Sequence, residues 1–148
     1  MSAIVSNIIT QTKLIAQTEL GASYQELRFV QDVARNHLRG ARLSFGVRPL
    51  GAIPVSTVTN YYTVDQTFEI ILADSIARKD DDSEKEASLG EMYDQADEIF
   101  KAMINSKINL AASVLSVSQP TYLEPEIYDD QSMVVLRMQC VVKWRSPT

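Results

Sequence analysis

The sequence predicts an α+β fold in which an antiparallel sheet of about four strands carries two main helices on one face. Three observations lead to this prediction. A long segment in the second half has the apolar spacing of an amphipathic helix, the C-terminal segment alternates between apolar and polar residues, and a helical segment opens the chain. Because strands, a helix and further strands follow one another, we expect antiparallel pairing with the helices on one side.

The totals indicate a single domain spanning residues 1–148. A chain of 148 residues with 45% hydrophobic residues buries most of its apolar surface without metals or disulfides. The single cysteine, Cys140, excludes an internal disulfide, and no zinc-site spacing is present. The chain has no apolar run long enough to span a bilayer, and its first residues lack the pattern of a signal peptide. We therefore expect a protein made and used inside a cell, away from membranes.

The charges are gathered in two blocks of opposite sign. Residues 24–49 hold five arginines against two acidic residues, whereas residues 65–98 hold twelve acidic residues against three basic ones. Such blocks can dock head-to-tail on copies of the same chain, which gives a ring when the rotation closes. The alternative is that both blocks are solvated faces. The net charge of −5 argues against nonspecific nucleic-acid binding by the whole surface.

The first predicted helix covers residues 2–19. Ile4, Ile8 and Ile15 fall near one stripe of it, and Gly21 follows as a C-terminal cap.

Residues 24–48 satisfy two opposing patterns. Ser23 followed by Glu26 matches a capping box and favours a helix. Leu27 and Phe29 instead alternate as in a strand, which would lead into an arginine-rich loop. These patterns alone leave the choice open.

Residues 50–60 are rich in Gly, Pro, Ser and Thr and predict a hairpin-like excursion or a loop at the sheet edge. Residues 62–74 predict a strand, in which Phe68, Ile70 and Leu72 share one face.

The clearest predicted element is a helix beginning at Ser83, which forms a second capping box with Glu86. Its apolar residues follow the i, i+3, i+4 pattern almost without a break, which makes a wide face suited to lie on a sheet. They are Leu89, Met92, Tyr93, Ala96, Ile99, Phe100, Met103 and Ile104.

Two further strands are predicted, over residues 114–119, ending at Pro120, and over residues 133–145. An acidic loop joins them. The last strand has one apolar face, which includes Cys140. Its other face must meet water or a neighbour, because arginine and lysine are rarely buried unpaired; its basic residues are Arg137, Lys143 and Arg145.

The sequence offers no catalytic, cofactor-binding or metal site. Hydrolysis needs a nucleophile beside a base, but the one histidine, His37, lies among arginines. Cys140 on an apolar strand face is expected to be buried and unreactive, with a raised pKa. The adjacent carboxylates at 80–82 lack the alternating ligands and the glycine of a calcium loop.

Three stretches carry a resemblance to a known family: residues 45–50 (Phe-Gly-Val-Arg-Pro-Leu), residues 65–72 and residues 135–139. They resemble phage structural proteins known as tail-completion or minor tail proteins. The order of elements is also similar to that of tail terminators of long-tailed phages, in which a helix, an antiparallel sheet and a second helix build one protomer of a six-membered ring. This resemblance favours a strand over residues 24–34.

The resemblance implies a structural virion protein at the tail end or head–tail junction, present in the host cytoplasm during assembly, and not an enzyme. Its partners would be copies of itself, the tail-tube protein and a neck or head-completion protein, while genome DNA would only pass through the lumen. A lumen that does not grip phosphate is acidic or neutral, so Asp80, Asp81 and Asp82 are assigned to a lumen or partner face. The candidates for the remaining protein contacts are Arg28, Arg35, Arg39, Arg42, Arg48, Arg137, Lys143 and Arg145.

Three alternatives stay open at this point. A head-completion or neck adaptor protein would share the ring symmetry and the lack of catalysis. A non-viral binding module would use the acidic helix face as its partner surface. A small hydrolase would depend on His37.

Overall fold

The computed structural model describes residues 2–21, 25–26, 44–58, 61–75, 82–105, 114–128 and 133–147. The elements within these ranges are α1 (Ser2–Leu20), β1 (Gln25–Glu26), β2 (Ser44–Val58), β3 (Tyr61–Ser75), α3 (Asp82–Asn105), β4 (Val114–Tyr122), β5 (Glu126–Tyr128) and β6 (Met133–Pro147).

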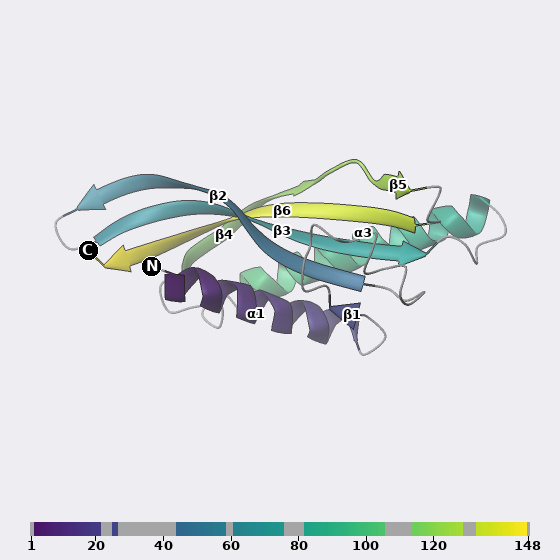
Figure 1. The fold of residues 1–148 in the computed structure, drawn as a ribbon, viewed down its shortest axis with the longest axis horizontal. Coiled ribbons are helices and arrows are strands. Elements are labelled where there is room, and N and C mark those ends of the chain that lie inside the picture. Colours follow the sequence, from purple (N-terminus) through teal and green to yellow (C-terminus); the bar gives the residue numbers. More distant parts are fainter. Residues whose placement is uncertain are drawn as a thin grey trace.

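The strands form one sheet in the order β1-β2-β3-β6-β4, with β5 also paired to β6. Every pair is antiparallel except β1 with β2. Both helices lie along the same face of the sheet (Figure 1). The predicted α+β class, with an antiparallel sheet and two main helices on one face, is confirmed. The two extra strands, β1 and β5, are only two and three residues long.

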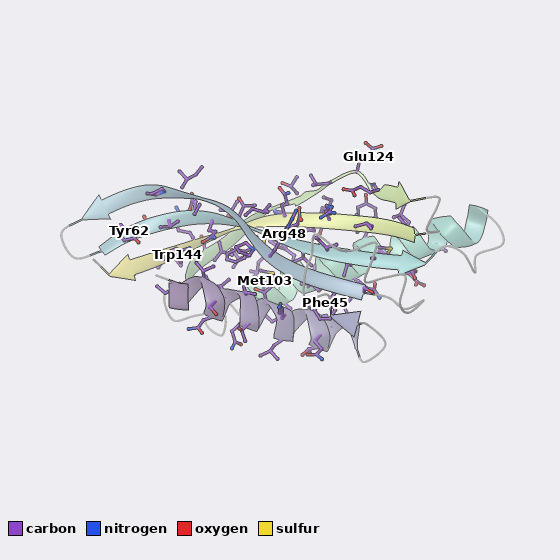
Figure 2. The ribbon with its side chains drawn as sticks, in the orientation of Figure 1. Phe45, Arg48, Tyr62, Met103, Glu124 and Trp144 are labelled. Carbon is purple, nitrogen blue, oxygen red and sulfur yellow. The ribbon has the colours of Figure 1, made fainter. Side chains whose placement is uncertain are left out.

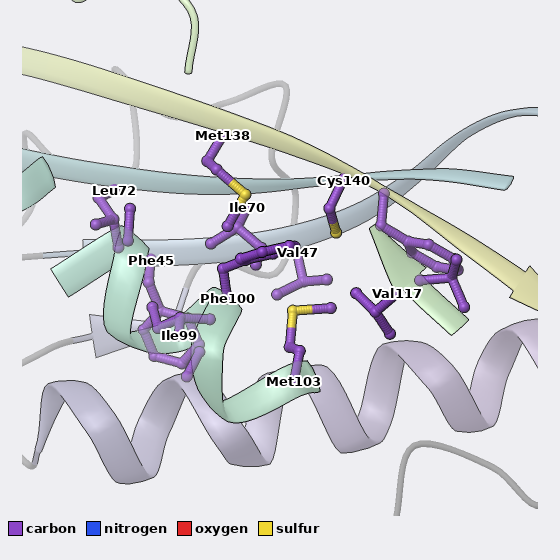
Figure 3. Close-up of a cluster of buried hydrophobic side chains, with 14 of the residues drawn as sticks. Phe45, Val47, Ile70, Leu72, Ile99, Phe100, Met103, Val117, Met138 and Cys140 are labelled. Atoms are coloured by element: carbon purple, nitrogen blue, oxygen red, sulfur yellow. The ribbon is translucent and has the colours of Figure 1, made fainter. Parts of the chain in front are cut away.

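The core lies between the helices and the sheet because the strands alternate as their sequence predicts. The apolar face of β6, from Val134 to Trp144, is buried together with Phe68, Ile70 and Leu72 of β3. Figure 3 shows Ile99, Phe100 and Met103 of α3 packed against this layer. The helix α1 contributes mainly Ile8, Ala16 and Leu20.

The helix boundaries follow the predicted signals in part. Gly21 has a φ of +82°, and its N–H donates to the carbonyl of Gln17 at 2.9 Å, so the predicted cap of α1 is confirmed. The helix α3 begins at Asp82, so Ser83 lies inside the helix rather than at the predicted cap position. Ile104, predicted on the apolar face of α3, is 42% exposed because the core ends at Met103.

Two predictions about the strands are corrected by the structure. Of the two alternatives for residues 50–60, the loop at the sheet edge is wrong for residues 50–58, which continue β2 as one arm of a hairpin with β3, with register shifts between Pro49 and Ala52 and between Pro54 and Ser56. Likewise β4 runs through Pro120, where its pairing with β6 also shifts. Proline is tolerated in both places because an edge strand need not donate every N–H to a neighbour. Of the ambiguous residues 24–48, those at 24 and 27–43 lie outside the described residues.

No helix in the described ranges is long and apolar enough to cross a membrane.

Truncating the centre of the core should be costly. Phe68 is fully buried in β3, so Phe68→Ala is expected to lower the free energy of unfolding by about 3–5 kcal/mol. Leu14→Ala, at a position 51% exposed on α1, should change it by less than about 1 kcal/mol. Urea unfolding of both variants measures these changes. Equal losses of unfolding free energy in the two variants would contradict the described core.

Candidate interaction surface

The predicted site residues do not all fall in the described part of the chain. Arg28, Arg35, Arg39, Arg42, Asp80 and Asp81 lie outside it, as does His37. Asp82 is the first residue of α3, Arg48 lies on β2, and the remaining three candidates, Arg137, Lys143 and Arg145, lie on β6. The roles proposed for them stay predictions; the structure shows where the described ones are and what holds them.

A charge network occupies the middle of the sheet face that is turned away from the helices. The carboxylate of Glu69, whose side chain is 2% exposed, accepts hydrogen bonds from Arg48 Nε at 2.8 Å, Arg137 Nη1 at 3.0 Å and Gln139 Nε2 at 3.0 Å. Arg48 is labelled in Figure 2 at this point of the sheet. A buried carboxylate needs such paired donors, because leaving it alone would cost several kcal/mol.

Arg137 also ties the short strand β5 to this network. Its Nε donates to Glu126 Oε1 at 2.9 Å. Burial alone would lower the pKa of Arg137, but the contacts with Glu126 and Glu69 outweigh burial and raise that pKa. The guanidinium groups of Arg48 and Arg137 thus already neutralise carboxylates of their own chain.

The three long strands extend past the helices at one end of the molecule (Figure 1). The strands β2, β3 and β6 each have fifteen residues, or roughly 50 Å, whereas the nineteen residues of α1 span about 28 Å. We call the part of the sheet at this end of the molecule the sheet end; it comprises residues 51–58, 61–67 and 141–147. Among the side chains described there, Ile53, at 69%, and Val55, at 50%, are large apolar ones exposed to solvent.

Two shallow hollows lie on the two faces of the sheet end. The hollow on the helix side is apolar, measures about 470 Å³ and is lined by Val5, Ala52, Pro54, Tyr62, Val64, Gln66 and Trp144. Figure 2 shows Tyr62 and Trp144 near this end; their rings lie 6.3 Å apart, and Trp144 Nε1 donates to Gln66 Oε1 at 3.2 Å. The hollow on the outer face measures about 360 Å³ and is lined by Gly51, Ala52, Ile53, Asp65, Thr67 and Val141. Neither lining contains a histidine, a cysteine or a serine.

The net formal charge of α3 equals that of the whole chain. The helix contains seven acidic and two basic residues, which gives −5, the same as the net charge of all 148 residues. Its first turns lie at the end of the molecule opposite the sheet end (Figure 1). The two ends of the long axis therefore differ: one holds the start of α3, whose sequence is acidic, and the other is built from strands and exposes some apolar side chains.

The edges of the sheet are poorly suited to pairing with another strand. Beyond its short pairing with β1 at Ser44 and Phe45, β2 contains two prolines and two register shifts. At the other edge, β4 contains Pro120 and two register shifts. Prolines and bulges at edges are devices that oppose strand addition. Contacts with partners are thus expected to use the faces of the molecule.

The described residues do not bring potential metal ligands together. No three His, Cys, Asp or Glu side chains there lie close enough to hold a metal ion. Cys140 is buried on the core face of β6, and burial raises the pKa of its thiol to about 12, as predicted from the strand pattern.

No protein-family model matches the chain, and no curated protein matches its sequence. Among solved structures, a chain of the virion of a native gene transfer agent (GTA) particle is similar to it over 94% of this chain and 92% of that chain, with 10% identity and a TM-score of 0.42. A likeness this distant does not indicate a function.

Glu69 is expected to hold the outer face together. Glu69→Ala leaves two partly buried guanidinium groups without their shared carboxylate, which should cost about 3–5 kcal/mol of unfolding free energy. Glu126→Ala, which removes a more exposed partner of Arg137 alone, should cost about 1 kcal/mol or less. Chemical denaturation measures the free energy of unfolding of both variants. A loss of only about 1 kcal/mol for Glu69→Ala would contradict a structural role for the network.

The Cys140 thiol should resist alkylation in the folded protein. Because its pKa is raised to about 12 by burial, almost no thiolate forms at pH 8, and the thiolate is the reactive species. Iodoacetamide should modify Cys140 only after unfolding in denaturant, as read by mass spectrometry. Rapid modification of the native chain would show that β6 opens at this residue.

Proposed function

We propose that the protein is a structural subunit of a tailed-phage-type virion, and specifically a tail terminator. In this role six copies close a ring on the end of the tail tube. One face of the ring meets the tube and the other meets the neck, while genome DNA passes through the lumen. No residue performs chemistry in this function, since interfaces do the work.

The observation that supports the proposal best is the polarity of the molecule. An elongated protomer with an acidic helix at one end and an exposed, partly apolar sheet end at the other is suited to contacts between unlike surfaces. Contacts of this kind are heterologous and generate rings when the rotation closes. The confirmed order of helix, strands, helix and strands is also the order that the sequence resemblance to tail terminators implies.

The acidic helix suits a ring that surrounds DNA. Lysine and arginine attract the phosphates of DNA, and their binding releases the counterions that surround the DNA. The first half of α3, from Asp82 to Asp94, has five acidic residues and one lysine. Placed at the lumen or at a partner face, these turns would not retain the genome, in agreement with the assignment of Asp82.

The proposal predicts that the protein stops the growth of tail tubes. Tail-tube subunits polymerised with the protein present should give short tubes of uniform length with an added ring at one end in electron micrographs. Tubes polymerised without it should grow to variable lengths. Binding to portal or neck complexes with no effect on tubes would replace the terminator by a head-completion adaptor, and binding to neither would overturn the virion function.

A further inference from the structure

One row of side chains crosses the outer face of the sheet end. Ile53 of β2 is paired with Asp65 of β3, and Asp65 is paired with Lys143 of β6. Val64, Val142 and Trp144, which flank Asp65 and Lys143, point into the core, so Asp65 and Lys143 face outward. Ile53 lines the outer hollow together with Asp65, whereas its neighbour Pro54 lines the hollow on the helix side. Ile53, Asp65 and Lys143 are 69%, 36% and 41% exposed. Since neighbouring strands lie about 4.8 Å apart, the row presents an apolar, an acidic and a basic group at even spacing.

A ridge on the surface of α3 also presents one apolar and two oppositely charged side chains in a line. Ile104, Lys101 and Glu98 are three residues apart on the side of the helix turned away from the core. They are 42%, 59% and 59% exposed. Side chains at this spacing are neighbours on a helix surface, about 5–6 Å apart. The ridge thus presents an apolar, a basic and an acidic group at nearly the spacing of the row.

The row and the ridge are complementary position by position. Laid on the row, the ridge places Ile104 against Ile53 and the outer hollow, Lys101 over Asp65, and Glu98 over Lys143. Within one chain Lys143 is only loosely paired, since its Nζ lies 3.9 Å from Asp65 Oδ1. Lys101 Nζ lies 3.0 Å from Asp97 Oδ2 and 3.7 Å from Glu98 Oε1, but these pairs are exposed, and exposed ion pairs are exchanged at little cost. Asp65 Oδ1 is shielded from solvent and accepts no hydrogen bond, while the Asp65 side chain as a whole is 36% exposed. A lysine from a neighbouring molecule can pair with the exposed part of this carboxylate.

We propose that the α3 ridge Glu98–Lys101–Ile104 of one copy packs on the row Ile53–Asp65–Lys143 of the next copy. The row lies on the sheet face away from the helices, and the ridge lies on the outer side of the helix layer. One chain therefore keeps both surfaces available and can contact two neighbours at once, which is the condition for a ring. This contact rests on the proposed ring function and specifies its subunit interface.

A pair of cysteines tests the contact directly. Oxidation of Ile53→Cys/Ile104→Cys protein assembled on tail tubes should give a ladder of disulfide-linked oligomers on a non-reducing gel, because each copy carries both halves of the contact. The buried Cys140 should not contribute. The matched control, Ile53→Cys/Leu14→Cys, moves the second thiol to an equally exposed site on α1 and should remain monomeric. A ladder from the control, or none from the test pair, would overturn the contact.

Charge reversal tests its register. Lys143→Glu and Glu98→Lys should each raise the dissociation constant of self-association about tenfold, because each places like charges opposite one another. Sedimentation velocity measures this constant. The double variant Lys143→Glu/Glu98→Lys should recover most of the loss. Glu19→Lys makes the same charge change at an exposed site on α1 and should leave association unchanged.

The same samples distinguish the two proposals. If the wild-type protein forms rings on tubes while both reversals assemble normally, the contact is wrong and the ring function stands. If the wild-type protein neither associates nor binds tube ends, the ring function and this contact both fail.

Discussion

The register between β2, β3 and β6 decides which side chains reach the helices and which face outward. Phe68 lies opposite Cys140 and Ile70 opposite Met138, all on the core face. A shift of one residue would turn this whole set to the outer face, since side chains alternate along a strand. Glu69 opposes such a shift, because Arg48 and Gln139 are its paired neighbours in this register alone. Apolar burial on one face and a charge network on the other therefore specify the same alignment.

The lengths of the elements then determine the free surface. Three paired strands of fifteen residues extend past the helices that cover them, and Ile53 and Val55 are exposed at the sheet end. Prolines and register shifts weaken both edges as templates for another strand. The exposed outer face, on which Lys143 lies beside Asp65, is the surface proposed for contacts. An assembly built by such faces needs no residue with perturbed chemistry.

The sequence predicts the elements whose periodicity is strong and fails where composition misleads. The helix α3 and the strand β6 lie within about two residues of their predicted bounds, because one face of each is consistently apolar. The stretch from Gly51 to Pro54 was predicted outside the strands, since glycine and proline indicate turns, yet an edge strand accommodates them. The network around Glu69 was missed because its partners lie 21 and 68 residues away along the chain, and only the register brings them together. Lys143 was predicted as a contact residue, whereas Ile53 was missed because its surroundings were predicted as a hairpin-like excursion or a loop rather than as part of a long strand.

The proposed function requires a closed ring of identical subunits at the end of a tail tube. Light scattering of the purified protein, alone and after release from tube ends with its contacts fixed by mild crosslinking, measures this most directly. A closed ring should give a single species of about six times the 16.6 kDa subunit mass in the tube-released sample, without larger open chains. A mass of one subunit in both samples, with no protein retained on the tubes, would contradict it.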